Sequence, residues 1–237
     1  MSTAKILVLD CETKPAQAYV WRLFDENISL DQLISPSEVI CVGAMWLGAK
    51  DVMFFSEWQH SKAGMLKQIH ALLFEADAVV TYNGDKFDLP KLNGEFVSLG
   101  LPPVPPLTSI DLYKAVRKLG LQSNKLAFVG PHLKIGAKVK HEGFSLWVSV
   151  MEGKESALKK MERYCKMDVR LTGRLYTRLR PYITNHPHMA EVKGHECGAC
   201  GGHHLQKRGY RRTKSFKIQR LQCQTCGSWS DGERSKV

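Results

Sequence analysis

Two acidic residues near the start of the chain, Asp10 and Glu12, have the type and spacing of a metal site. They follow the short apolar run Lys-Ile-Leu-Val-Leu, which predicts a buried strand. Side chains two residues apart on a strand point the same way, so the carboxylates would lie together. Burying two like charges is costly unless a cation neutralises them, and Mg²⁺ and Mn²⁺ prefer oxygen ligands. The pair favours a divalent metal site, with an ordinary strand-end turn as the alternative.

Two further aspartates, Asp88 and Asp168, lie on predicted elements that could bring them close to Asp10 and Glu12. Asp88 follows a short predicted strand and falls at the start of a predicted helix, where an anion is favoured. A simple N-cap aspartate is the alternative there. Asp168 comes four residues after Tyr164 in a long predicted helix, so the two side chains share a face beside an apolar stripe. A buried aspartate needs a partner, whereas a surface hydrogen bond between Tyr164 and Asp168 would need no site at all.

Taken in order, these clusters resemble the motifs of a known enzyme family. Asp-x-Glu on a first strand, Asn-x-x-x-Phe-Asp ending at Asp88, and Tyr-x-x-x-Asp ending at Asp168 are similar to the exonuclease motifs of the DEDD superfamily. These are ribonuclease-H-like 3′→5′ exonucleases, and the tyrosine of the third motif is typical of the DEDDy branch. The resemblance spans roughly residues 5 to 180. It implies a catalytic set that holds two Mg²⁺ or Mn²⁺ ions for two-metal hydrolysis: Asp10, Glu12, Asp88 and Asp168.

The same resemblance gives Tyr164 a catalytic role in positioning the attacking water. Because an unperturbed tyrosine has a pKa near 10, Tyr164 would be a poor general base at neutral pH. We therefore expect orientation of the water by hydrogen bonding. Lys138 and Lys140, in a glycine-bearing loop, could contact phosphates, but a solvated face is the favoured interpretation. For Asp111, at the end of a predicted strand, a helix cap is favoured over support of the site.

A second constellation, made of four cysteines, lies near the C-terminus. Two Cys-x-x-Cys pairs separated by 22 residues predict a tetrahedral site for one structural Zn²⁺: Cys197, Cys200, Cys223 and Cys226. His195, His203 and His204 are alternative ligands that we do not favour. Two predicted strands between the pairs make this module resemble a zinc ribbon. The strands carry basic and aromatic residues that suit contact with nucleic acid: Lys207, Arg208, Tyr210, Arg211, Arg212, Lys217 and Arg220.

The elements that must position these residues follow from hydrophobic periodicity. Short apolar runs predict strands at 5–9, 38–47, 51–55, 78–81 and 107–112, with the second antiparallel to the first. Helical spacing predicts helices at 61–75, with Ser61 as N-cap, and at 87–99, 114–119, 125–129 and 156–180. A short helix near residues 19–24 and a loop-rich stretch at 131–154 complete the pattern. We predict an α/β ribonuclease-H-like fold, with a mixed five-stranded sheet flanked by helices and a small zinc ribbon.

Length and charge set limits on the class of protein. The 237 residues, 43% of them hydrophobic, can form one packed domain at 1–185 and a small one at 192–237. No apolar run reaches membrane-spanning length and the start leaves no room for a signal peptide, so we expect a cytoplasmic protein without a membrane partner. The net charge is +11, and residues 186–237 hold 10 Lys/Arg against 4 Asp/Glu. This excess predicts a polyanionic partner.

These observations together predict a metal-dependent 3′→5′ exonuclease that releases nucleoside 5′-monophosphates. Single-stranded DNA is the expected substrate, and a polymerase or another replication or repair protein is a candidate partner for the ribbon. An exoribonuclease or structure-specific nuclease of the same fold is the nearest alternative. A non-catalytic nucleic-acid-binding or scaffold protein acting through the ribbon is the alternative from another class, although the intact carboxylate set argues against it.

Overall fold

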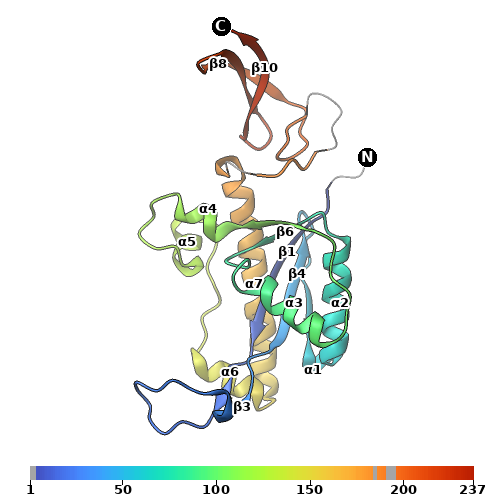
Figure 1. Cartoon of the computed structure of the whole chain (residues 1–237), viewed down its shortest axis with the longest axis vertical. Helices are drawn as coiled ribbons and strands as arrows, with labels where there is room; N and C mark the ends of the chain where they lie inside the picture. The colour runs from blue at the N-terminus through green and yellow to red at the C-terminus, as the bar shows by residue number, and fades with distance from the viewer. Residues whose placement is uncertain (1–3, 184–185, 191–195) are drawn as a thin grey trace.

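A larger α/β part and a small β part make up the chain (Figure 1). The computed structural model describes residues 4–183, 186–190 and 196–237. The domain limits predicted at 185 and 192 lie outside the described residues. Among the helices that are described, none combines the length and the apolar character needed to cross a membrane.

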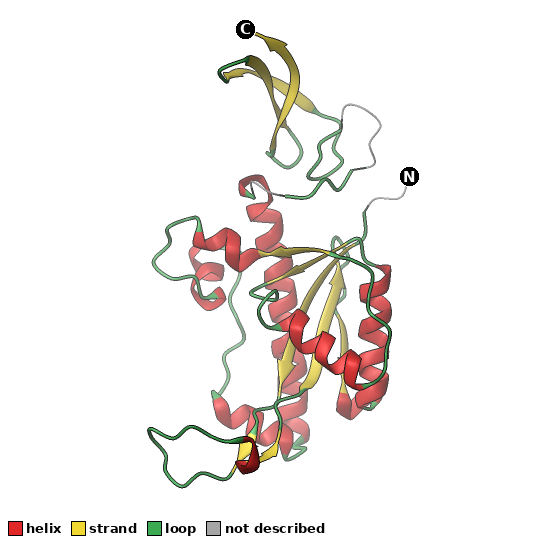
Figure 2. Cartoon of the chain, viewed as in Figure 1, coloured by secondary structure: helices red, strands yellow, loops and turns green. Residues whose placement is uncertain are grey.

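The α/β part is built on a sheet flanked by helices (Figure 2). The sheet has five strands in the order β5-β4-β1-β6-β7. The central strand β1 pairs antiparallel with β4 and parallel with β6. β5 is antiparallel to β4, and β7 is parallel to β6. This topology confirms the predicted mixed five-stranded α/β sheet. The strands are β1 (Ile6–Thr13), β4 (Val39–Trp46), β5 (Met53–Ser56), β6 (Ala78–Thr81) and β7 (Thr108–Asp111).

Helices cover both faces of this sheet. Side chains alternate along β1: Leu7 and Leu9 pack with α2 and α3, whereas Ile6 and Val8 pack with α7 and the shorter α4 and α5. Both layers are needed because a central strand is apolar on both faces. The helices are α1 (Glu57–His60), α2 (Lys62–Glu75), α3 (Asp88–Ser98), α4 (Leu112–Arg117), α5 (Leu126–His132), α6 (Phe144–Met151) and α7 (Glu155–Leu179), followed by the 3₁₀ turn η2 (Arg180–Tyr182).

Two helix starts use the caps that the sequence predicts. The Ser61 side chain accepts a hydrogen bond from the Gly64 N–H at the start of α2. Asp111 caps α4 by accepting from the Tyr113 N–H at 3.0 Å, and the same oxygen accepts from the Asn83 N–H at 2.7 Å. Both caps satisfy backbone donors that would otherwise lack partners in the first turn of the helix.

Close packing of α7 on the sheet depends on a glycine in β4. A Cβ atom built on Gly43 would lie 2.8 Å from Val169 Cγ2 and 3.0 Å from Cys165 Sγ. Any side chain there would push α7 away from the sheet. Because Asp10 of β1 pairs with Gly43, this close approach occurs beside the acidic end of β1.

The segment between β1 and β4 differs from its prediction. Instead of a helix near residues 19–24, it contains β2 (Gln17–Ala18), the 3₁₀ turn η1 (Leu30–Gln32) and β3 (Leu33–Ser35). The predicted helix is wrong because the apolar residues in this stretch find no core to cover: Trp21 is 92% exposed and Phe24 81%. A short helix without a buried face is not stable in water.

The loop-rich stretch predicted at 131–154 contains a helix, α6. Its sequence, Phe-Ser-Leu-Trp-Val-Ser-Val-Met, lacks a polar face and has two β-branched residues, which hides the helical pattern. Leu146 and Val150, four residues apart, are buried in a cluster with Met161 of α7. Packing on α7 therefore decides the conformation of this segment.

The C-terminal part is a three-stranded antiparallel sheet in the order β10-β9-β8. Its strands are β8 (Leu205–Arg212), β9 (Phe216–Cys223) and β10 (Trp229–Lys236). The sequence predicts the first two strands but not β10. Seven of the eight residues of β10 are exposed, so the strand has no apolar alternation to reveal it.

Candidate active site

Three carboxylates from distant parts of the chain meet at the end of β1. Oxygens of Asp10, Glu12 and Asp168 all lie within 4.8 Å of one another. Asp10 and Glu12 continue the series of β1 side chains that includes Val8, which packs on the α7 side of the sheet. Asp168 lies on α7, which Gly43 allows to approach closely. Strand alternation and one close helix contact thus assemble the cluster.

The cluster is electrostatically unsatisfied in the protein alone. Asp10 Oδ2 and Asp168 Oδ1 are buried, and neither has a hydrogen-bond partner within the described part of the chain. Burial, followed by repulsion from Asp168, raises the pKa of Glu12 to about 8. Burial and then the Asp88 charge raise the pKa of Asp10 well above its usual value. Such a group of buried acids is arranged to receive positive charge.

Lys138 supplies part of that positive charge. Its Nζ lies 2.6 Å from Asp168 Oδ2 and donates to the Tyr164 hydroxyl at 3.0 Å. Burial lowers the pKa of Lys138, but the Asp168 carboxylate and the Tyr164 hydroxyl outweigh it and raise the pKa overall. The favoured interpretation of Lys138 as a solvated residue is therefore wrong, whereas Lys140 is exposed. The sequence around Lys138 does not predict its contact with Asp168, because a loop brings the lysine to α7.

Asp88 lies beside the three-carboxylate cluster and not within it. It is the first residue of α3 and is buried, and its Oδ1 accepts a hydrogen bond from the Cys11 N–H at 2.8 Å. Burial raises its pKa to about 6, although the Cys11 hydrogen bond opposes this. The contact fixes the carboxylate of Asp88 against the backbone between Asp10 and Glu12. The neighbouring Phe87 is 38% exposed.

Tyr164 lies on the same face of α7 as Asp168, as the spacing predicts. The tyrosine is 7% exposed and Asp168 2%, so the alternative of a surface pair is wrong. The rings of His141 and Trp147 pack edge-on against Tyr164, with centroids 4.9 and 6.0 Å away. Burial, followed by the negative charge of Glu12, raises the pKa of Tyr164. The hydroxyl therefore stays protonated at neutral pH and can orient a neighbouring group by hydrogen bonding.

An open groove of about 830 Å³ contains Asp10, Lys138 and Asp168. The rings of Tyr82 and Tyr113, 5.9 Å apart and edge to face, lie along it. The groove could admit an extended substrate to the carboxylates. Its other lining residues are Asn83, Lys86, Ser123, Asn124, Lys125, Leu126 and Ala127, which sequence analysis did not single out as a group.

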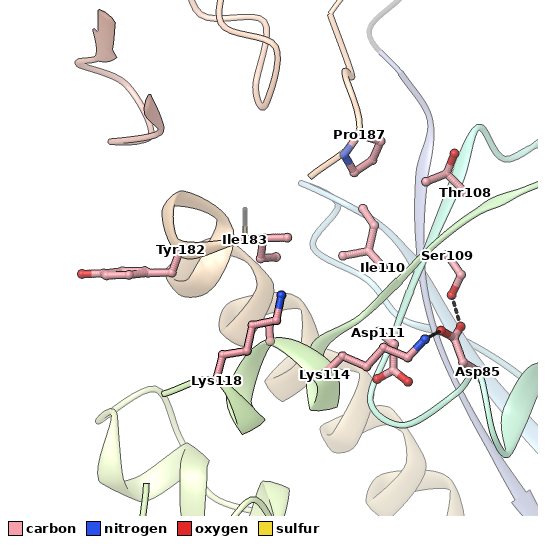
Figure 3. A pocket seen from close by; sticks show the side chains of 11 residues that line it. Asp85, Thr108, Ser109, Ile110, Asp111, Lys114, Lys118, Tyr182, Ile183 and Pro187 are labelled. Carbon is pink, nitrogen blue, oxygen red and sulfur yellow. Dashed lines mark hydrogen bonds and ion pairs between the residues drawn. The ribbon is translucent and has the colours of Figure 1, made fainter. Parts of the chain in front are cut away.

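Asp85 and Asp111 belong to a different cavity, of about 330 Å³ (Figure 3). There Asp85 accepts hydrogen bonds from the Ser109 hydroxyl and the Lys114 ammonium group, as the dashed lines show. These contacts stabilise the turn after β6. Asp85 is therefore occupied away from the carboxylate cluster.

The carboxylate cluster fits a divalent cation. Mg²⁺ and Mn²⁺ bind oxygen ligands, and the site offers carboxylate oxygens within 4.8 Å of one another, two of them buried without partners. Asp10, Glu12 and Asp168 could hold such an ion directly, and Asp88 could join through the side of its carboxylate not bound to Cys11.

We expect the stability of the metal-free protein to fall between pH 5 and 8. The pKa of Glu12 is about 8 in the folded protein against 4.5 ordinarily, so the folded state holds its proton to higher pH than the unfolded state. The resulting stability is complete below the ordinary pKa and is lost as pH rises through the folded value. Added Mg²⁺ should therefore raise the melting temperature more at pH 8 than at pH 5.

Glu12→Gln is the control for this effect, because glutamine does not titrate. Scanning fluorimetry without added Mg²⁺ should show a shallower fall in melting temperature with pH for Glu12→Gln than for the unmodified chain. The same slope in both proteins would contradict the electrostatic account of the cluster.

The four predicted zinc cysteines come together in the C-terminal part. Cys197 Sγ lies 3.7 Å from Cys226 Sγ, and Cys200 Sγ lies 3.7 Å from Cys223 Sγ. Four sulfurs bound tetrahedrally to zinc at about 2.3 Å are about 3.8 Å apart, whereas a disulfide needs about 2.05 Å. The arrangement fits a Cys₄ Zn²⁺ site. His203 and His204 are outside the cluster, and His195 lies outside the described residues.

Strand register separates the basic residues of the ribbon onto two faces. Tyr210 pairs with Gln219 and Arg212 with Lys217, so Tyr210, Arg212 and Lys217 share a face. The Lys217 ammonium lies 4.2 Å from the centre of the Tyr210 ring. Lys207 is on this face too, Arg211 and Arg220 are on the other, and Arg208 lies in the irregular part of β8.

Comparison with known families identifies the α/β part. The family model of the RNase H superfamily matches residues 32–180. The chain belongs to the RNase H superfamily. This membership supports a nuclease that uses divalent metals and acts on nucleic acid. The match includes Asp88, Lys138, Tyr164 and Asp168, whereas β1 precedes it and the ribbon follows it.

Solved structures show the same RNase H fold. The chain is similar to the family B DNA polymerase from the hyperthermophilic archaeon Pyrobaculum calidifontis, with a TM-score of 0.58 and 17% sequence identity. The similarity covers 76% of this chain but only 25% of the polymerase. No curated protein matches the chain.

Proposed function

We propose that this chain is a metal-dependent 3′→5′ exonuclease of the DEDDy type. It hydrolyses phosphodiesters of nucleic acid, with a preference for single-stranded DNA, and releases nucleoside 5′-monophosphates. The observation that carries the proposal is the cluster of Asp10, Glu12 and Asp168, whose oxygens lie within 4.8 Å of one another. Asp10 and Asp168 also line an open groove. Superfamily membership supports the nuclease chemistry.

Two Mg²⁺ or Mn²⁺ ions, when bound, would supply an activated water and stabilise the departing 3′ oxygen. Asp10, Glu12 and Asp168 bind these ions, and Asp88 completes the set from the start of α3. The Cys11 N–H holds Asp88 in place, which limits its freedom before any substrate arrives. Burial and pre-existing contacts thus fix the geometry on which in-line displacement depends.

Tyr164 and Lys138 act on the water and the phosphate. The Tyr164 hydroxyl accepts a hydrogen bond from Lys138, so its own proton can be donated toward the reacting group. Since its pKa is raised, Tyr164 orients the water and does not remove a proton from it. Lys138 forms an ion pair with Asp168, and its ammonium group could stabilise negative charge on a phosphate bound beside that carboxylate.

The alternative functions share parts of this site. An exoribonuclease or a structure-specific nuclease would use the same carboxylates. A scaffold or binding protein would not need buried carboxylates with unpartnered oxygens, because these destabilise a fold that has no cation to bind. This cost favours the nuclease over the scaffold.

The direction of attack tests the exonuclease proposal. The chain should be incubated with Mn²⁺ and with 5′-labelled or 3′-labelled DNA and RNA strands, both single and double. We expect 3′-labelled single-stranded DNA to release labelled mononucleotide first, and 5′-labelled strands to shorten progressively. A 3′-phosphate should slow cleavage, whereas a blocked 5′ end serves as the control and should have no effect. Labelled mononucleotide from a 5′-labelled strand at the earliest times would contradict the direction.

A further inference from the structure

One face of the ribbon sheet gathers aromatic rings and arginines from β9 and β10. On β9, Phe216 and Arg220 are four residues apart and therefore point to the same side. On β10, Trp229 pairs with Gln222 and Arg234 with Ile218, which places both on that side too. We call this surface, made of Phe216, Arg220, Trp229 and Arg234, the Trp229 face.

Contacts across the strands confirm the register. The Arg220 guanidinium lies 5.8 Å from the centre of the Trp229 ring, and the Arg234 guanidinium lies 5.5 Å from that of Phe216. Each aromatic ring is thus accompanied by a cation. Such pairs hold flat rings and positive charge at fixed positions on the rigid sheet.

Trp229 remains accessible. It is 53% exposed, and it lines an open hollow of about 310 Å³ together with Arg220 and the Arg211–Asp231 pair. This volume lies at the lower end of the range for small-ligand sites. A large aromatic ring held beside a hollow offers one face to another planar group, because stacking needs no further rearrangement.

The arginines on this face differ in whether an acidic residue already neutralises them. Arg211 donates from Nε to Asp231 Oδ1 at 3.0 Å and binds the second oxygen through Nη2, so its charge is neutralised. In the described part of the chain, Arg220 and Arg234 take part in no ion pair. The cations beside the rings are therefore free to bind an anion. Flat rings flanked by unpaired guanidinium groups match a strand of unpaired bases on a phosphate backbone.

The sheet that carries the Trp229 face lies beyond the C-terminal end of α7 (Figure 1). A Cβ atom on Gly227, which directly follows the second cysteine pair, would lie 3.5 Å from Pro181, so the zinc end of the ribbon packs against the turn after α7. Asp168 is 11 residues before the last residue of that helix, Leu179, which is about 16 Å along its axis. This face can therefore contact only parts of a strand remote from the reacting phosphate.

We propose that the Trp229 face binds an unpaired nucleic-acid strand by stacking a base on Trp229 and pairing phosphates with Arg220 and Arg234. In this arrangement the ribbon retains the strand while its end is processed at the carboxylates, a role that rests on the proposed nuclease function. Binding itself does not rest on that function, so the two can be tested separately.

Binding should be measured by fluorescence anisotropy on the full chain carrying Asp10→Asn, which prevents degradation. The probes are labelled 30-mers of oligothymidine and oligouridine over a range of salt concentrations. We expect Trp229→Leu to weaken binding by about 5- to 150-fold, and Trp229→Tyr to restore most of the loss. Joint replacement of Arg220 and Arg234 by glutamine should make the log–log salt slope shallower by about 1.4. Phe74→Leu, an exposed aromatic change on α2, is the matched control and should not alter affinity.

Two comparisons can overturn the assignment. Tyr210→Leu changes the opposite face of the sheet, and an equal or larger loss there would show that the Trp229 face is not the site. Inorganic polyphosphate carries charge without bases; if Trp229→Leu weakened its binding as much as that of the 30-mers, stacking would be excluded. Zinc content should be measured for each variant, because a zinc-loaded ribbon shows that the sheet is intact. If Trp229→Leu loses zinc, the Arg220 and Arg234 variants decide the outcome.

Cleavage assays with native Asp10 separate this proposal from the nuclease. If the chain binds strands through the Trp229 face but cleaves neither DNA nor RNA, the face is supported and the nuclease is contradicted. If the chain cleaves strands and Trp229→Leu binds them with unchanged affinity, the nuclease is supported and the face is contradicted.

Discussion

Asp168→Asn is expected to abolish cleavage while the fold remains intact. The substitution keeps the size of the side chain but removes a charged ligand from the cluster with Asp10 and Glu12. Loss of a metal ligand should cost several kcal/mol of transition-state stabilisation, or roughly a 10³-fold lower rate. Stability should change little, because the variant loses the Lys138 ion pair but also relieves the burial of a carboxylate, and burial outweighs the ion pair in raising the pKa of Asp168. Single-turnover cleavage and thermal melting measure the two effects.

Asp85→Asn is the matched control for Asp168→Asn. Asp85 is a partly buried aspartate in the turn after β6, and its carboxylate is bound to Ser109 and Lys114 in the separate cavity of Figure 3. We expect this variant to cleave at close to the unmodified rate. A folded Asp168→Asn protein that also cleaved at that rate would remove the carboxylate cluster from the mechanism.

The second large effect is expected in the ribbon: Cys223→Ser should unfold the three-stranded sheet and leave the α/β part folded. The ribbon has few buried apolar side chains, chiefly Ile218, so its own core cannot stabilise it. Structural zinc contributes about 10–16 kcal/mol in small modules of this kind. Zinc analysis should show loss of the ion, and limited proteolysis should remove the ribbon while the α/β part resists.

Cys41→Ala is the control for Cys223→Ser. Cys41 is fully buried in β4, outside the four-cysteine cluster, so the variant should lose some stability of the α/β part but keep its zinc. If Cys223→Ser kept both zinc and a protease-resistant ribbon, the Cys₄ site would be wrong. The ribbon would then need another source of stability.

Much of the fold could be predicted because its signals are local. The α2 helix begins after Ser61 and ends at Glu75, as the apolar spacing and the cap indicate. The long α7 has a regular apolar stripe, and the structure places it within one residue of its predicted limits. Where the apolar pattern was weak, as in α6 and β10, prediction failed. The conformation of those segments depends on neighbours distant in the chain.

In the candidate site, too, the features set by local periodicity could be predicted, and the contacts set by tertiary packing could not. The sequence by itself determined that Asp10 and Glu12 point together and that Tyr164 and Asp168 share a helix face, because strand and helix periodicities are properties of the local backbone. Only the tertiary structure decided that Lys138 enters the cluster. It also decided that Asp88 is held by a backbone N–H of β1, and that the ribbon's arginines divide between two faces. These outcomes depend on which surfaces pack or pair with one another. The identities of neighbouring residues do not specify such contacts across the chain.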